Sequence, residues 1–141
     1  MKALNISRHL RDAVAARVGK VGAPYTLYGW FGLLNAPIYY LIWRYAAPET
    51  YENGWLRLLC AVLCLGLVLH RYWSKRWQPW LPLYWYVTLL TTLPFFFSFN
   101  LMMDAGSAMW IANNILMVFF VLLLVDSLSA ILLLAAGSLL G

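Results

Sequence analysis

The chain has 141 residues, of which 64% are hydrophobic and only 11% are charged. Soluble domains carry about 25% charged residues, so this composition excludes an ordinary soluble domain and indicates a membrane protein. The net charge of +5 comes from basic residues next to the apolar stretches. Anionic lipid headgroups are therefore a more plausible partner than nucleic acid.

Residues 1–22 are the only segment that we expect to be exposed to water. Leu10, Val14 and Val18 recur every four residues, and most of the basic residues lie off that stripe. This spacing predicts a short amphipathic helix on the cytoplasmic surface of the membrane.

Five apolar stretches follow this segment, and the first four are each about the length of one membrane crossing. A crossing helix needs about 20 mostly apolar residues, because each residue rises about 1.5 Å through a hydrocarbon core about 30 Å thick. Residues 23–141 are therefore predicted to form an all-α, polytopic transmembrane bundle with about five crossings. The expected helices span residues 25–47, 54–70, 80–103, 107–125 and 127–140.

The basic residues predict how the bundle is oriented. They precede the first stretch and fill the connection after the second, at Arg71, Lys75 and Arg76, whereas the first and third connections contain none. Short loops rich in Lys and Arg stay in the cytoplasm. The chain is thus predicted to be a multi-pass protein with a cytoplasmic amino end, and five crossings leave the carboxyl end outside.

The first crossing and the start of the second contain polar and aromatic residues. Asn35 and Pro37 lie inside the first crossing, where the proline is expected to kink the helix. Tyr28 belongs to an aromatic cluster expected at the membrane surface. Arg57 is expected to reach water beside the first outer loop and to pair with an acidic residue there, Glu49 or Glu52.

The third and fourth crossings hold the remaining polar groups. Thr92 precedes Pro94 and an aromatic run, and Trp110 shares a helix face with Asn113 and Asn114. Asn amides in lipid need partners. Two interpretations stay open: the amides clamp neighbouring helices, or they form a polar spot for a ligand head group beside an aromatic wall.

The sequence contains none of the motifs of common enzymes, such as a phosphate-binding loop or a nucleophile elbow. Cys60 and Cys64 are expected to pack against a neighbouring helix without binding metal. His70 is expected to be an exposed interfacial residue, although a haem or chlorophyll ligand is the alternative. We therefore expect no enzyme activity, no metal and no cofactor. The function that the sequence still supports is binding of a small apolar molecule between helices.

Four runs in the chain resemble a known family. They are YGWFGLLNAPIYY at 28–40, YEN at 51–53, LPFFFSF at 93–99 and SAMW at 107–110. Together, and in this order, they resemble the membrane sensor of the CqsS-type and LqsS-type quorum-sensing histidine kinases, over about residues 28–125.

The resemblance implies a six-helix sensor in the bacterial inner membrane that binds an α-hydroxyketone autoinducer. It also implies a cytoplasmic histidine kinase that forms a homodimer and signals through phosphorelay, and the chain would then be a fragment of a longer receptor. Trp110 matches a ligand-binding tryptophan of the family, whereas Asn113 stands where the family has a serine. The expected ligand-binding residues are Trp110, Asn113, Asn35 and Thr92.

A second class of function stays open. The abundant aromatic residues and the last helix, which is rich in Ala and Gly, also suit a small, non-catalytic structural or accessory subunit of a larger membrane complex.

Overall fold

The computed structural model describes residues 12–19, 23–46, 51 and 53–141, and all its regular elements in these ranges are helical. The described helices include α2 (Tyr25–Ala46), α3 (Gly54–Val68) and α7 (Ser127–Leu140). The remaining elements are η1 (Leu69–Tyr72), η2 (Gln78–Trp80), α4 (Leu81–Leu90), η3 (Thr91–Phe95), α5 (Phe96–Met103) and α6 (Ala108–Leu124). The expected all-α class is confirmed.

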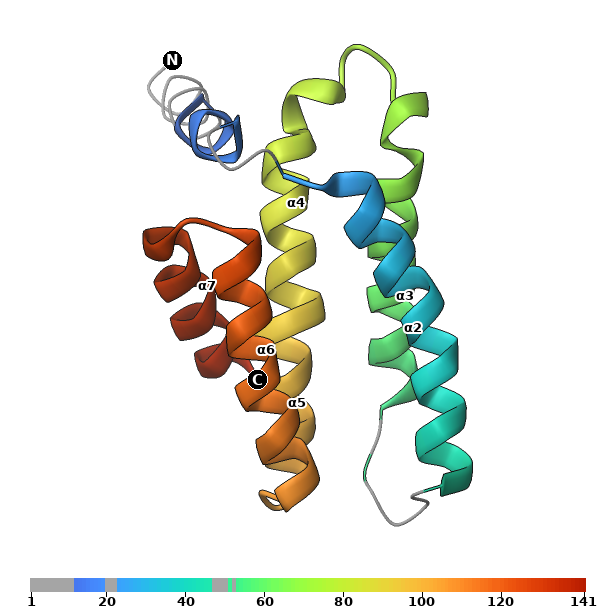
Figure 1. Ribbon diagram of the computed structural model, residues 1–141. Helices are drawn as coiled ribbons and strands as arrows, with labels where there is room; N and C mark the ends of the chain where they lie inside the picture. Colours follow the sequence, from blue (N-terminus) through green and yellow to red (C-terminus); the bar gives the residue numbers. More distant parts are fainter. Residues whose placement is uncertain (1–11, 20–22, 47–50, 52) are drawn as a thin grey trace.

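The helices form a bundle with two unequal parts (Figure 1). Helices α2 and α3 lie side by side as an antiparallel pair. The continuous rod formed by α4, η3 and α5 runs down the middle, with α6 and α7 packed on its other side. The core between these layers includes Leu67, Trp85, Leu89 and Val121, each at most 1% exposed.

Within the described ranges, two helices are long and apolar enough to cross a membrane. They cover Gly54–Tyr72 and Gln78–Met103, while α6 and α7 are apolar but shorter. Many large apolar side chains of the bundle also face outward, as suits contact with lipid. Five crossings therefore remain a prediction.

Pro94 lies in the π-helical part of the central rod. The five residues of η3 are π-helical, and this local widening accommodates a proline that has no backbone N–H to donate. The hydroxyls of Thr91 and Thr92 donate to the carbonyls of Val87 and Thr88, at 2.9 and 2.7 Å. Around Pro37, in contrast, α2 runs without interruption from Tyr25 to Ala46.

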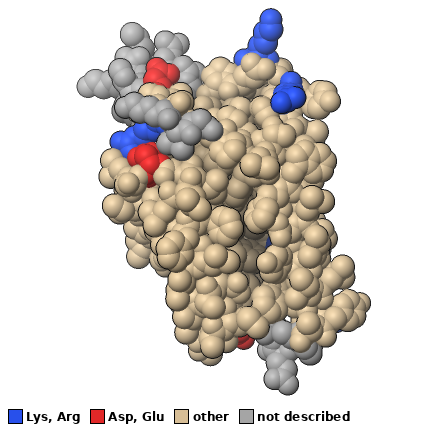
Figure 2. Space-filling view, viewed as in Figure 1, with Lys and Arg blue, Asp and Glu red and all other residues tan. Residues whose placement is uncertain are grey.

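The charged groups lie mainly at the two ends of the bundle. On the face shown in Figure 2, Lys and Arg lie mainly at one end, and a wide band with almost no charged surface, hollowed near its middle, separates this end from a small acidic patch at the other. Such a band is the surface that a bilayer accommodates.

Part of the predicted amphipathic segment is described. Residues 12–19 are helical, and Val18, 6% exposed, packs against the core of the bundle. Residues 1–11 and 20–22 lie outside the described ranges, so the extent of this helix stays a prediction.

Asp126 connects that segment to the start of α7. Its carboxylate accepts the hydroxyl proton of Ser129 at 2.7 Å and the Ser129 amide at 3.2 Å, and the Arg17 guanidinium lies 3.7 Å away. These hydrogen bonds, and then the positive charge of Arg17, hold the pKa of Asp126 below its ordinary value. The ionised carboxylate therefore caps α7.

This cap predicts a pH dependence of stability. A lowered folded-state pKa means that the stabilisation is complete above the unfolded-state pKa and is lost as the pH falls through the folded-state pKa. We expect the thermal unfolding midpoint in mild detergent to fall with acidification. The midpoint of the Asp126→Asn variant should fall less steeply over the same pH range. Identical pH profiles of the two proteins would show that the carboxylate charge does not stabilise α7.

Candidate functional site

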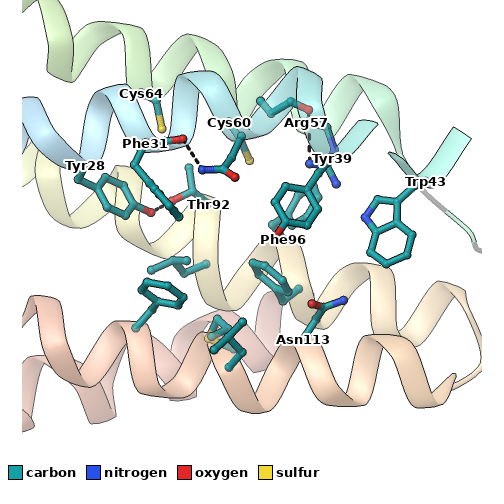
Figure 3. Close-up of a pocket in the computed structure, with 18 of the residues that line it drawn as sticks. Tyr28, Phe31, Tyr39, Trp43, Arg57, Cys60, Cys64, Thr92, Phe96 and Asn113 are labelled. Carbon is teal, nitrogen blue, oxygen red and sulfur yellow. Dashed lines mark hydrogen bonds between the residues drawn. The ribbon is translucent and has the colours of Figure 1, made fainter. Parts of the chain in front are cut away.

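A cavity of about 150 Å³ lies between the α2–α3 pair and the rest of the bundle. Its walls come from α2, α3, η3, α5 and α6, and most of them are apolar or aromatic (Figure 3). Phe31 and Leu116 line the cavity and are themselves 50% and 53% exposed, so the cavity is not fully enclosed.

All four residues expected from the sequence line this cavity: Asn35 on α2, Thr92 on η3, and Trp110 and Asn113 on α6. They come from three different helices, so the fold brings together residues as far apart in sequence as 35 and 113. This placement makes the cavity the candidate site, while binding by these residues remains a proposal.

Trp110 forms the centre of an aromatic cluster. Its side chain is 1% exposed, and its ring centroid lies about 6 Å from the rings of Trp43, Phe96 and Phe97, at 6.0, 6.1 and 6.0 Å. The two phenylalanine rings meet it edge to face, the favoured geometry for aromatic pairs. Ser107 begins α6 and accepts the Trp110 amide, which fixes the first turn of the helix.

The indole N–H of Trp110 is buried and has no hydrogen-bond partner among the described residues. A buried donor without an acceptor costs about 1–3 kcal/mol. An acceptor oxygen that entered the cavity within reach of this N–H would remove that cost.

The side-chain amides of the asparagines on α2 and α6 have different hydrogen-bond partners. Asn35 donates to the carbonyl of Phe31 in its own helix at 2.7 Å, so it does not clamp a neighbouring helix. Asn114 donates to Phe97 at 3.0 Å and thereby joins α6 to α5. The Asn113 side chain lines the cavity and makes no hydrogen bond to another described side chain or backbone group. Asn114 therefore fits the interpretation of a clamp between helices. Asn113 fits the interpretation of a polar group for a ligand head.

Sequence reasoning missed Tyr28 as a residue of this site. It was expected at the membrane surface, and that expectation is wrong: the ring is 7% exposed and packs edge to face on Trp85 at 5.2 Å. Its hydroxyl lies 2.6 Å from the Thr92 hydroxyl. The YG run at 28–29 lets this happen, because Gly29 has no side chain and the α2 backbone can approach α3 closely.

Arg57 also lines the cavity, a position that the sequence did not predict. Its guanidinium lies over the ring of Phe96, 5.1 Å from the centroid, and donates to the carbonyl of Ala36 at 3.5 Å. The residue lines the cavity from the first turn of α3. Glu49 and Glu52, the expected partners, lie outside the described residues.

The two cysteines are both buried in the wall of the cavity, and they are free thiols. Cys64 packs against Gly32 of α2, as expected for a small residue between close helices. Among the described residues, no group of three or more His, Cys, Asp or Glu side chains gathers to hold a metal ion. His70 lies in η1, at the end of the bundle, with Nδ1 2.7 Å from the Leu67 carbonyl.

The chain is similar to the CAI-1 autoinducer sensor kinase/phosphatase CqsS of Vibrio cholerae serotype O1, with 42% identity over 100 residues. The expected resemblance to the CqsS-type sensors is confirmed. The matched region covers 71% of this chain and 15% of the length of that relative. No protein-family model and no solved structure matches the chain.

This similarity corrects one expectation. No enzyme was expected from the sequence, yet the CqsS relative is itself named a kinase and phosphatase. The match spans only 15% of the length of that relative, so these activities are stated of the relative alone.

Proposed function

We propose that this chain is the ligand-sensing membrane portion of a two-component quorum-sensing receptor. In this proposal the cavity binds a medium-chain, apolar autoinducer of the α-hydroxyketone type between the helices. The observation that carries the proposal is the cavity itself. Trp110, Asn113, Asn35 and Thr92 line it in a chain that is similar to an autoinducer sensor.

The chemistry of the walls supports an amphiphilic ligand. Aromatic and aliphatic side chains offer contact area to an alkyl tail, and a few polar groups can orient an oxygenated head. The buried N–H of Trp110 and the amide of Asn113 both have spare hydrogen-bonding capacity among the described residues. A hydroxyketone head supplies acceptors for both and a hydroxyl donor for the Asn113 carbonyl.

We further propose that the protein crosses the bacterial inner membrane about five times with its amino end in the cytoplasm. The positions of the basic residues support this orientation. Arg71, Lys75 and Arg76 follow α3 at one end of the bundle, and the turn after α5 at the opposite end holds Asp104 and no basic residue. Residues 1–22 form the cytoplasmic amphipathic segment, and residues 23–141 form the sensor bundle.

Signalling follows from a shift between two helix packings. A ligand that binds one packing better than the other raises its population by that difference in affinity. The α2–α3 pair and the rest of the bundle each supply walls of the cavity, so their relative position is the arrangement that a ligand would bias. In this proposal a homodimeric cytoplasmic histidine kinase reads the bias.

Filling the cavity tests the proposal. Asn113→Trp places a large side chain at the cavity wall, and we expect the affinity for a medium-chain α-hydroxyketone to fall at least about tenfold, the loss of about 1.4 kcal/mol. Binding is measured by calorimetry with the protein in lipid nanodiscs.

Ala112→Trp is the matched control, because Ala112 is exposed and does not line the cavity. The affinity of Ala112→Trp for the α-hydroxyketone should stay within about twofold of the wild-type affinity, a change of less than about 0.5 kcal/mol. Equal binding by wild type and Asn113→Trp, or no binding by wild type, would refute the proposed function.

A further inference from the structure

The cavity is elongated along α2. On this helix its lining begins at Tyr28 and ends at Trp43, which is about 22 Å along the helix axis at about 1.5 Å per residue. Figure 3 shows these two residues at opposite ends of the cavity. A volume of about 150 Å³ spread over this length is narrow, so a chain-like ligand would lie along α2.

The polar and apolar lining residues are separated along this length. At one end Trp43 packs against Trp110, with ring centroids 6.0 Å apart, and toward the other end Phe31 packs against Phe120, at 5.9 Å. The indole N–H of Trp110, which has no hydrogen-bond partner among the described residues, therefore lies at the Trp43 end. Asn113 follows Trp110 by one turn on the same face of α6. A ligand whose head meets these two residues points its tail toward the opposite end.

Tyr28 closes the end of the cavity that receives the tail. Its ring is 7% exposed and packs edge to face on Trp85, which is itself 1% exposed, so another buried ring supports it. The Tyr28 and Thr92 hydroxyls lie 2.6 Å apart. Thr92 donates to the Thr88 carbonyl at 2.7 Å, so the proton between the two hydroxyls comes from Tyr28. Both hydroxyl protons are used within the protein, and the ring is fixed by its hydroxyl as well as by its face.

We propose that Tyr28 determines the longest alkyl tail that the cavity accepts, by forming a fixed wall at its end. This inference rests on the proposed function and gives a specificity-determining role to a residue outside the four predicted from the sequence. Each methylene that enters the cavity raises the affinity roughly fourfold, which corresponds to about 0.8 kcal/mol. A methylene that reaches Tyr28 finds no room, because the ring cannot turn aside without losing its hydrogen bond to Thr92 and its contact with Trp85.

The test measures the affinities of a series of α-hydroxyketones whose saturated tails grow by one methylene at a time. Calorimetry is done on the full chain in lipid nanodiscs, and the partition of each probe into empty nanodiscs is subtracted. In wild type we expect the affinity to rise with tail length and to pass through a maximum. A tail two methylenes longer than this maximum should bind at least about fivefold more weakly, the low end of the cost of overpacking.

Tyr28→Leu removes the outer part of the ring, and we expect the maximum to move to tails at least two methylenes longer. A loss of stability alone would weaken all probes without changing the preferred length. Tyr28→Phe keeps the ring but loses the hydroxyl, so its maximum should stay at the wild-type length. Leu27→Ala is the matched control, because Leu27 is next to Tyr28 but is 73% exposed and does not line the cavity. Its whole length profile should match that of wild type.

A maximum that stays at the wild-type length in Tyr28→Leu would overturn the inference. A wild-type affinity that levels off instead of falling would also overturn it, because longer tails would then leave the cavity through its open side. Failure of wild type to bind any member of the series would overturn the proposed function as well.

Wild type supplies a second test if Tyr28→Leu does not fold. A diazirine at the tail end of the best-binding probe should label Tyr28, and a diazirine beside the head should label Trp110 or Trp43. The reverse labelling would show that the tail lies at the other end, and would overturn the inference while leaving the proposed function intact.

Discussion

Replacing Trp110 with alanine is expected to cause the largest loss of both stability and ligand affinity among the single substitutions in the cavity wall. The indole is 1% exposed and contacts Trp43, Phe96 and Phe97, so its removal takes one ring contact from each of the three. Truncation of a buried Trp costs about 3–5 kcal/mol. We expect a lower thermal unfolding midpoint and a hydroxyketone affinity at least about tenfold weaker, since each edge-to-face pair alone is worth about 0.5–1.5 kcal/mol.

The conservative variant Trp110→Phe separates packing from hydrogen bonding. It keeps an aromatic ring among the three neighbours but has no N–H, so we expect most of the stability to return while part of the affinity loss remains. Met109→Ala is the matched control, because Met109 is next to Trp110 but 45% exposed. If Trp110→Ala bound the hydroxyketone as tightly as wild type does, Trp110 would not be part of the binding site.

Gly137→Leu is expected to displace α7 from the bundle. Gly137 is buried, and a Cβ at this position would collide with the side chain of Pro94 and lie 2.9 Å from the Phe95 amide nitrogen. A proline ring and a backbone amide cannot move aside as the end of a flexible side chain can. Overpacking of this kind costs about 1–3 kcal/mol, which lowers the midpoint of thermal unfolding by several degrees.

The same substitution should also weaken ligand binding, because α7 presses on η3 and Thr92 of η3 lines the cavity. Ala135→Leu is the matched control: Ala135 is exposed on the same helix, so the added side chain should change the midpoint little. Equal midpoints for Gly137→Leu and wild type would show that the close contact between α7 and Pro94 does not stabilise the fold.

The helical class of the fold could be predicted from the sequence because it follows from composition. Long apolar stretches without charges leave the backbone no partner in lipid except its own helix. The π-helical turn at η3 could not be predicted in the same way. It depends on Pro94 together with the packing of Gly137, which lies 43 residues further along the chain.

The candidate site was partly predictable. Polar residues in apolar stretches are costly, so Asn35, Thr92 and Asn113 attract notice in the sequence, and all three line the cavity. Tyr28 and Arg57 were not predicted to line a cavity, because tyrosine and arginine near the ends of a crossing usually face the headgroups. Their positions at the cavity depend on how closely α2 and α3 approach each other. The residue pattern of a single helix does not predict that approach.

The proposed function requires that the ligand occupy the cavity between the helices. Photoaffinity labelling in nanodiscs measures this, with a medium-chain α-hydroxyketone that carries a diazirine at the end of its tail. We expect adducts on cavity-lining residues such as Met117, Phe120 or Cys64. Free hydroxyketone should suppress these adducts, and they should be lost in Asn113→Trp. Adducts confined to outward-facing residues such as Leu123, 79% exposed, and insensitive to competitor, would contradict it.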